Sequence, residues 1–187
     1  FQNPKYYDKV KLVTFGEYNP FKKILKFEKL TDGVLDFSSG KKTNSFKLEK
    51  INYNIAILIC YEIIFPSKVI NGFRPDFIVN ITNDAWYGNT IGPLQHLAAA
   101  RVRAIEEGLP VLRAANTGIS AVIDQYGKYI QRLELGKEGV IDTNISLSNL
   151  KTIFSKYGNY IYLISLIFML MLVKFPFISK NSTNWSK

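Results

Sequence analysis

Cys60 is the residue of this 187-residue chain best suited by type and position to do chemistry. It ends the apolar run 55–59 and stands where the sequence predicts that a helix begins. Backbone N–H groups at a helix start stabilise a thiolate, which is the form of cysteine that attacks a carbonyl carbon. The alternative is a buried structural cysteine, a common role for a cysteine at the end of a strand.

Four other side chains are candidates for a site, and each is weak when taken alone. Glu62 follows Cys60 by two residues, and Trp86 lies in a polar and aromatic loop. Asp84, in the same loop, is as easily an Asx-turn residue as a site residue. His96 lies on a predicted helix. We interpret it as structural or at the surface, because a Cys–His dyad needs an orienting geometry that the sequence does not supply.

The composition excludes several classes of protein. One cysteine excludes an internal disulfide framework, and one cysteine with one histidine excludes a Cys/His zinc cage, so we expect no metal and no cofactor. The net charge of +9 comes from excess basic residues at the two ends, without a run of five, so nucleic-acid binding is not expected. The chain begins at Phe1 rather than methionine, and we interpret it as a piece of a longer protein.

The elements that must position these residues form a predicted α/β domain with a mixed sheet. Continuous apolar runs predict buried strands, and a turn at 125–128 joins the last two strands as a hairpin. The predicted strands are 55–59, 76–82, 110–115, 119–124 and 129–133, and the predicted helices are 63–72 and 93–108. In the second helix, the spacing predicts an inner face made of Leu94, Leu97, Ala98, Arg101, Val102 and Ile105.

The last forty residues have a different character. Residues 157–178 carry a single charged side chain, which puts this stretch near the lower limit for a membrane span of about 20 residues. Tyr157, Tyr160 and Tyr162 stand at one end, as aromatic residues do at a membrane interface. We therefore predict a transmembrane helix over 157–178 and a polar tail at 179–187, with a buried core helix as the alternative.

Four sequence blocks in a fixed order resemble the nitrilase superfamily. They are KVKLVTFGEYNP at 9–20, ICYE at 59–62, NDAWYG at 83–88 and RAANTGIS at 113–120. Within the superfamily, the chain is similar to the membrane branch, the apolipoprotein N-acyltransferases. The resemblance covers only the C-terminal part of that family's length. It implies a partial nitrilase-like α-β-β-α sandwich over residues 1–150, followed by one C-terminal transmembrane helix.

The resemblance also implies a set of site residues. The residues that match the family's site are Cys60, Lys9, Glu17, Tyr61 and Glu62. Cys60 matches the nucleophile. The family's lysine lies eight residues before the Glu of the Phe-Gly-Glu block, which selects Lys9 over Lys11, and Glu17 matches a further essential glutamate. The residues after the nucleophile have a supporting role. The family's general-base glutamate lies upstream of that lysine, and the resemblance implies that this base is absent from this chain.

The reaction implied by the resemblance is a two-step acyl transfer. Cys60 takes an acyl chain from a phospholipid, phosphatidylethanolamine. The α-amine of a diacylglyceryl-cysteine at the N-terminus of an apolipoprotein then attacks the thioester. Trp86 and Tyr87 are candidates for a lipid-facing loop, with ordinary loop packing as the alternative. The implied location is the bacterial inner (cytoplasmic) membrane, with the catalytic domain on the periplasmic side and the missing N-terminal portion of the enzyme as a partner.

Two other functions stay open at this point. A nitrilase-type C–N hydrolase (an amidase) would cleave an amide or a nitrile with water through the same Cys60 and Lys9. A non-catalytic remnant or half-module would instead fold poorly or bind its missing half. In every case we expect the isolated chain to be inactive, because the resemblance leaves it without a general base.

Overall fold

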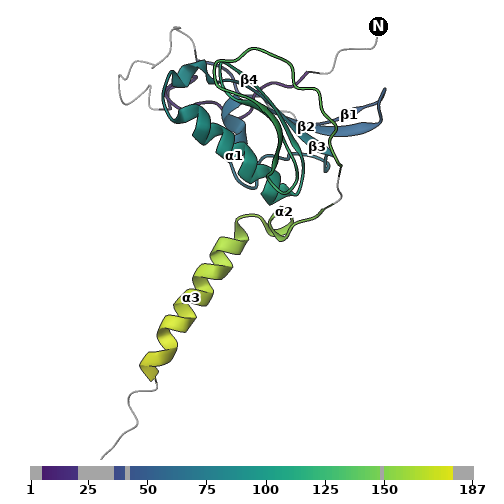
Figure 1. Ribbon diagram of the computed structural model, residues 1–187. Helices are drawn as coiled ribbons and strands as arrows, with labels where there is room; N and C mark the ends of the chain where they lie inside the picture. Colours follow the sequence, from purple (N-terminus) through teal and green to yellow (C-terminus); the bar gives the residue numbers. More distant parts are fainter. Residues whose placement is uncertain (1–5, 21–35, 41–42, 148–149, 179–187) are drawn as a thin grey trace, which may run out of the picture.

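Within residues 6–20, 36–40, 43–147 and 150–178, which the computed structural model describes, six strands form one mixed sheet (Figure 1). The strands are β1 (Ser45–Leu48), β2 (Tyr53–Ile59), β3 (Phe77–Asn83), β4 (Val111–Asn116), β5 (Ser120–Ile123) and β6 (Tyr129–Leu133). They lie in chain order across the sheet. β2, β3 and β4 run parallel to one another, and the remaining neighbours pair antiparallel. The predicted α/β fold with a mixed sheet is confirmed, and β1 alone among these strands has no predicted counterpart.

The carboxyl ends of β2, β3 and β4 lie at one edge of the sheet. Ile59 pairs with Ile81 across β2 and β3, and Asn83 pairs with Asn116 across β3 and β4. Because parallel strands end at the same edge, the residues that follow them are brought close together, and open α/β sheets use this edge to bind ligands. Cys60, directly after β2, therefore lies at the edge where a site is expected.

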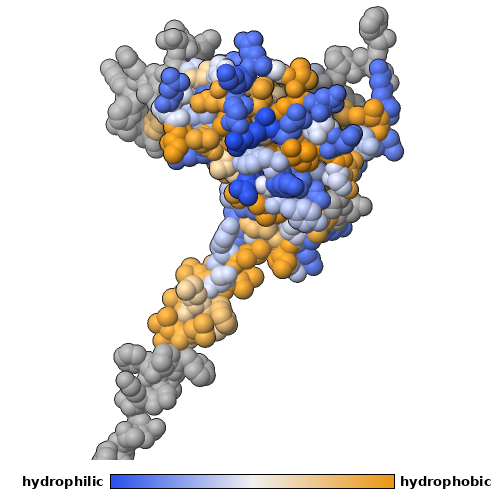
Figure 2. Space-filling view, in the orientation of Figure 1, coloured by the Kyte–Doolittle hydropathy of each residue, from blue (hydrophilic) through white to orange (hydrophobic). Residues whose placement is uncertain are grey.

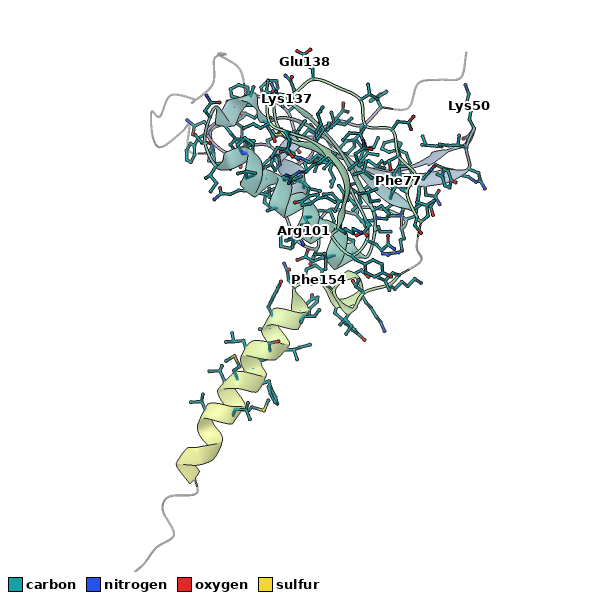
Figure 3. All side chains as sticks on the ribbon, viewed as in Figure 1. Lys50, Phe77, Arg101, Lys137, Glu138 and Phe154 are labelled. Carbon is teal, nitrogen blue, oxygen red and sulfur yellow. The ribbon has the colours of Figure 1, made fainter. Side chains whose placement is uncertain are left out.

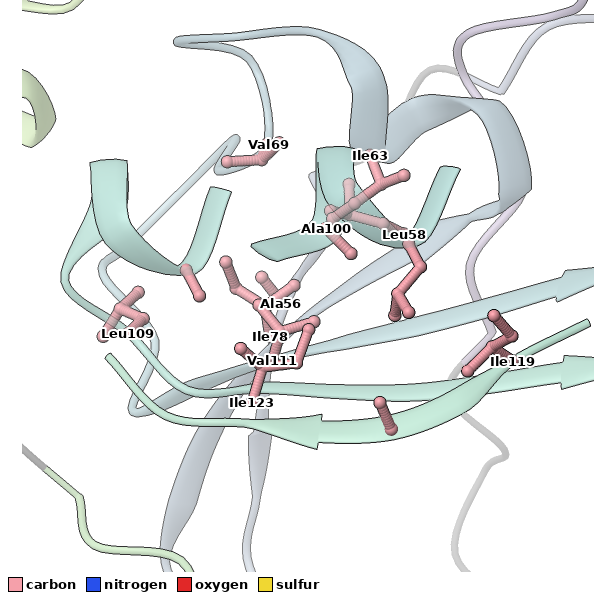
Figure 4. Close-up of a cluster of buried hydrophobic side chains, with 13 residues drawn as sticks. Ala56, Leu58, Ile63, Val69, Ile78, Ala100, Leu109, Val111, Ile119 and Ile123 are labelled. Atoms are coloured by element: carbon pink, nitrogen blue, oxygen red, sulfur yellow. The ribbon is translucent and has the colours of Figure 1, made fainter. Parts of the chain in front are cut away.

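Helix α1 (Gly92–Glu107) packs on one face of the sheet and closes the hydrophobic core (Figure 4). Its last turn ends at Gly108, whose φ of 63° lies in the left-handed region that favours glycine. Leu58, Ile78 and Val111 extend from the three parallel strands into the core and are at most 1% exposed. Burying a side chain of this size contributes about 1.5–3 kcal/mol, so this core fixes the relative position of the three strand ends.

The predicted inner face of α1 is wrong for most of its members. Leu94, Val102 and Ile105 are 54%, 41% and 45% exposed, whereas Leu97 is buried as predicted. His96, which we interpreted as structural or at the surface, is only 3% exposed. Polar side chains with buried hydrogen-bond partners occupy inner positions of this helix, so its apolar pattern does not mark the buried face.

A short 3-10 turn, η1 (Cys60–Ile64), replaces the helix predicted over residues 63–72. Phe65 has extended backbone angles, with φ −86° and ψ 110°. A residue that precedes proline avoids the α region because of a clash with the proline ring. Pro66 therefore prevents a continuous helix from passing through Phe65. A second 3-10 turn, η2 (Asp84–Tyr87), follows β3 at the same edge of the sheet.

The C-terminal part of the chain forms α2 (Ile153–Tyr157) and α3 (Tyr160–Ile178), and α3 extends away from the sheet (Figure 1). The described side chains of α3 are mostly apolar and exposed (Figure 2). The transmembrane helix predicted over 157–178 is not borne out, because no helix within the described residues is long and apolar enough to cross a membrane. Gly158, with φ 53°, breaks the apolar stretch. The predicted tail at 179–187 lies outside the described residues.

Candidate active site

Cys60 lies at the junction of β2 and η1, which we call the Cys60 turn (residues 59–62). Its thiol is free and half-buried. Its φ of 50° lies in the left-handed region, which costs a residue other than glycine roughly 1–2 kcal/mol. Backbone strain of this kind persists only where neighbouring contacts hold it, and it is concentrated at functional sites. The contacts on the two sides of the Cys60 turn therefore decide how the thiol is presented.

Glu62 binds one side of the Cys60 turn to the start of the chain. Its carboxylate is 3% exposed, and Oε2 accepts a hydrogen bond of 2.8 Å from the backbone N–H of Ile59. Oε1 accepts from the hydroxyl of Tyr7 at 2.8 Å and from the backbone N–H groups of Val10 and Lys11 at 2.7 and 3.0 Å. Burial, together with the hydrogen bond to Glu62, raises the pKa of the Tyr7 hydroxyl. Glu62 thus holds the N-terminal segment (residues 6–20) against the turn that carries the nucleophile candidate.

Lys9 and Glu17, both on the N-terminal segment, form an ion pair. Lys9 Nζ donates to both carboxylate oxygens of Glu17, at 2.6 and 2.8 Å, and their side chains are 12% and 27% exposed. The backbone N–H of Val13 donates to Glu17 Oε2 at 2.8 Å, which orients the carboxylate. The structure therefore brings these two predicted site residues together on a segment that contacts the Cys60 turn. Lys11, the rejected alternative, has an exposed side chain.

The predicted aromatic residues occupy different environments. The ring of Tyr61 packs edge-on against Phe65, with ring centroids 5.0 Å apart. Both rings line an open groove of about 670 Å³, whose other wall includes Leu12 on the N-terminal segment. Trp86 is 69% exposed, whereas Tyr87 turns inward and packs edge-on against His96 at 5.7 Å. Of the two residues predicted to face lipid, Trp86 is exposed and Tyr87 is partly buried.

A set of buried polar side chains, here called the buried polar cluster, lies on the other side of the Cys60 turn. Its members come from β3, η2, α1 and β4, and they are Asn80, Thr82, Asp84, His96 and Arg113. Arg113 Nη2 donates to Asp84 Oδ2 at 2.6 Å, and His96 Nδ1 lies 2.9 Å from Asp84 Oδ1. The other ring nitrogen, His96 Nε2, lies 3.2 Å from the backbone carbonyl oxygen of Cys60. The buried polar cluster therefore ends directly on the candidate nucleophile's own peptide group.

Asp84 is the centre of the buried polar cluster. Burial alone would raise the pKa of its carboxyl, but the hydrogen bond with His96 and the positive charge of Arg113 outweigh burial and lower that pKa. Thr82 Oγ1 donates a further hydrogen bond of 3.0 Å to Asp84 Oδ1. Gly118 leaves room for the carboxylate, because a Cβ atom at this position would lie 2.4 Å from Asp84 Oδ2. The Asp84 carboxylate is therefore held ionised and in one orientation.

Comparison with known proteins now identifies the family. The family model for carbon-nitrogen hydrolases matches residues 2–153. The chain is a carbon-nitrogen hydrolase family member. Among curated proteins, the apolipoprotein N-acyltransferase of Rickettsia typhi is 44% identical over 171 residues, covering 89% of this chain and 34% of that protein. The Rickettsia bellii protein of the same name is 48% identical over 171 residues, covering 90% and 34%.

The predicted resemblance is therefore confirmed: the chain is a homologue of apolipoprotein N-acyltransferases, and it spans about a third of the length of these curated relatives. Among solved structures, a cysteine-to-serine mutant of an amidase of the nitrilase superfamily from Nesterenkonia is 20% identical. That match covers 69% of this chain and 46% of the amidase, with a TM-score of 0.44. The sheet and α1 described above form a partial nitrilase-like α/β fold.

The candidate site residues of this family member that the sequence does not reveal are the partners of Asp84. His96 was treated as isolated and Arg113 appeared only inside a sequence block, yet both bind the same carboxylate. A usable signal was present, since Cys60 directly follows one predicted strand and Asp84 lies two residues after the next. Positions that follow neighbouring parallel strands meet at one sheet edge. Among the described residues, no three His, Cys, Asp or Glu side chains come together as metal ligands.

Proposed function

We propose that this chain supplies the nucleophile and oxyanion-binding residues of an apolipoprotein N-acyltransferase. The observation that carries the proposal is the Lys9–Glu17 ion pair on the segment that Glu62 binds to the Cys60 turn. An ammonium group on a segment that is bound to the nucleophile's turn suits acyl transfer, because the tetrahedral oxyanion needs donors that are already in place. The 44–48% identity to proteins named apolipoprotein N-acyltransferase supports the same assignment.

In the first step, the Cys60 thiolate attacks the ester carbonyl carbon of a phospholipid, which we propose is phosphatidylethanolamine. The carbonyl oxygen takes up the electron pair, and Lys9 and the backbone N–H of Tyr61 stabilise its negative charge. Collapse of this intermediate breaks the C–O bond, and the oxygen of the leaving lysophospholipid takes the proton that the base had removed from the Cys60 thiol. Cys60 then carries the acyl chain as a thioester, and Glu17 orients the Lys9 ammonium through two hydrogen bonds.

In the second step, the α-amine of a diacylglyceryl-cysteine at an apolipoprotein N-terminus attacks the thioester carbon. The C–S bond breaks, the Cys60 thiolate is restored, and the amine loses a proton. Proton transfer in such steps contributes about 10²–10⁴-fold. We propose that the base is a glutamate on the upstream portion of the intact enzyme, which acts as this chain's partner.

Both substrates are lipids, so we propose that the intact enzyme acts at the bacterial inner membrane, with this domain on the periplasmic side. The exposed Trp86 is suited to an interfacial position, since its ring combines apolar area with one N–H donor. The groove beside Tyr61, Phe65 and Leu12 offers an apolar wall to an acyl chain close to the Cys60 turn. Tyr87, which packs against His96, is assigned no lipid contact.

A second candidate function is hydrolysis of a carbon–nitrogen bond through the same cysteine. The match of residues 2–153 to the carbon-nitrogen hydrolase family favours it. The two functions differ in what attacks the acyl-enzyme: an amine in the transferase and water in the hydrolase. Free fatty acid as the main product, with no acylated lipopeptide, would support the hydrolase.

The test is to incubate the chain with phosphatidylethanolamine vesicles and a diacylglyceryl lipopeptide, with and without the upstream portion of the enzyme supplied as a second polypeptide. With both parts present, we expect a hydroxylamine-sensitive acyl group on Cys60 and acylated lipopeptide, and Cys60→Ala should abolish both. The 187-residue chain alone should show no transfer. An acyl group retained in Cys60→Ala would contradict the proposed nucleophile. Transfer by the chain alone would show that one of its own carboxylates acts as the base.

A further inference from the structure

The backbone of the Cys60 turn is bound by buried side chains at Ile59 and at Cys60. On one side, Glu62 accepts from the N–H of Ile59 at 2.8 Å. On the other side, His96 Nε2 lies 3.2 Å from the Cys60 carbonyl oxygen, and His96 is 3% exposed. The residue between these two contacts has a left-handed φ of 50° that is unfavourable without support. His96 contacts this backbone and not the sulfur, so any effect it has on chemistry acts through Cys60.

The contact with Cys60 fixes the hydrogen on His96. A carbonyl oxygen can only accept, so Nε2 must carry a hydrogen and donate it. The opposite ring nitrogen, Nδ1, lies 2.9 Å from the Asp84 carboxylate and 3.2 Å from Arg113 Nη2. An ionised carboxylate can only accept, so Nδ1 donates to Asp84 while Nε2 donates to Cys60, and the ring acts as a donor through both nitrogens.

His96 is itself held in place by a fully buried arrangement. Asp84 and Arg113 side chains are 0% exposed, and their ion pair has an N–O distance of 2.6 Å. Arg113 also donates to the side-chain oxygen of Asn80 and, through Nε, to the carbonyl oxygen of Ile119 at 3.3 Å. A planar guanidinium with several occupied donors has little freedom to rotate. Its orientation is therefore transmitted through Asp84 to the imidazole ring.

We propose that His96, oriented by Asp84 and Arg113, is a positioning residue that holds the Cys60 carbonyl and thereby fixes the direction of the nucleophilic thiol. The inference rests on the proposed function, in which Cys60 is the nucleophile. It assigns a specific role to a buried histidine that a purely structural interpretation treats as core packing. The buried polar cluster then controls the reactivity of Cys60 rather than only the stability of the sheet edge.

A first experiment uses the unmodified chain. It contains one histidine, so long-range ¹H–¹⁵N correlation spectra of the ring nitrogens report His96 without ambiguity. We expect the Nε2 resonance of a protonated nitrogen at neutral pH. A neutral ring protonated only at Nδ1 could not donate to Cys60 and would overturn the proposal.

A second experiment compares two substitutions that separate the two ring nitrogens. The amide nitrogen of glutamine reaches about as far as Nε2, whereas that of asparagine reaches about as far as Nδ1. His96→Gln should therefore keep the donor to Cys60, and His96→Asn should lose it. We expect His96→Asn to slow alkylation of Cys60 by iodoacetamide by about tenfold, the factor that one hydrogen bond is worth, and His96→Gln to stay near the unmodified rate.

Urea unfolding of both variants provides the control, because a purely structural role would lower stability in both and leave their alkylation rates per folded molecule equal. Equal rates, or a slower His96→Gln, would overturn the proposal. Neither measurement needs an acyl donor. A missing acyl group on Cys60 in the complete system therefore contradicts the proposed function, and equal alkylation rates contradict this inference.

Discussion

The two regions that meet at the Cys60 turn differ in how far water reaches them. On the N-terminal segment, the side chains of Lys9 and Glu17 are 12% and 27% exposed. In the buried polar cluster, the side chains of Asp84 and Arg113 are 0% exposed. Groups that stabilise charge on a substrate must be accessible to that substrate. Groups that position other side chains are most effective when they are shielded from water and fully hydrogen-bonded. Under the proposed function, we expect Lys9 and Glu17 to affect mainly the rate of acyl transfer, and Asp84 and Arg113 to affect mainly the geometry of the site.

The largest effect is expected from the accessible region. Lys9→Ala should slow acylation of Cys60 by about 10²–10³, since this is the typical loss when one oxyanion donor is removed. Stability should change by less than about 1 kcal/mol, because a partly exposed ion pair contributes little. The measurement is single-turnover acylation with the upstream portion supplied, and Lys11→Ala is the matched control with an exposed side chain. A larger loss in Lys11→Ala would show that the lysine was assigned wrongly.

Glu62 belongs to the boundary between the regions, and its replacement should affect stability most. Glu62→Gln keeps the size of the side chain but puts an amide where a carboxylate accepts four hydrogen bonds. We expect a loss of about 3 kcal/mol in the free energy of unfolding, because at least one buried N–H group is left unpaired. Glu138→Gln, on the surface (Figure 3), is the control in the same urea titration. Equal midpoints for the two variants would contradict the anchoring role of Glu62.

Gly118→Ala tests the packing of the buried polar cluster. The new Cβ atom would lie 2.4 Å from Asp84 Oδ2, and the carboxylate cannot move without losing Arg113. Overpacking of this kind costs about 1–3 kcal/mol, which thermal unfolding can measure. At Gly139 the added Cβ would meet only the flexible end of Leu133 at 3.3 Å, so Gly139→Ala is the control. Similar melting temperatures for both variants would show that the cluster has room to adjust.

The smallest effect is expected on the stability of the protein at acid pH. The pKa of Asp84 is lower in the folded protein than its ordinary value, so this group stabilises the fold above the unfolded pKa of about 4. That contribution is lost as the pH falls through the folded pKa. Burial raises the pKa of Glu106 and Glu107, whose contributions have the opposite sign. The stability difference between the unmodified chain and Asp84→Asn should therefore shrink below pH 4. A difference independent of pH would contradict an ionised Asp84.

The sequence predicted the sheet and α1 well, because these elements depend on local patterns. The boundaries of β2 and β3 follow from their apolar runs, and the start of β6 follows from the turn before it. The helix predicted after Cys60 does not form. Phe65 precedes Pro66, and a residue before proline avoids the α region of backbone angles. Short β1 has too few residues for a clear pattern.

The sequence likewise predicted only some of the residues of the candidate site. Cys60 and Glu62 were found from their place after a strand and from a family motif. The contacts of His96 with Asp84 and Cys60 join residues 12 and 36 positions apart, and no local pattern encodes them. The inner face of α1 was misassigned for the same reason, because a buried histidine there is stabilised by partners on other elements. The periodicity of a sequence does not show which polar groups pair with one another in the tertiary structure.

The anchoring of the N-terminal segment by Glu62 also bears on the order in which the protein folds. Val10 and Glu62 are 52 positions apart, so this contact closes a long loop and is formed only after β2 and η1 exist. In the native protein, we expect the segment to detach more readily than the core of β2, β3 and α1 opens. The amide hydrogens of Val10 and Lys11 should therefore exchange with solvent much faster than that of Ile78, which is hydrogen-bonded within the core. The part of the candidate site that carries Lys9 and Glu17 would then be the last to assemble and the first to open.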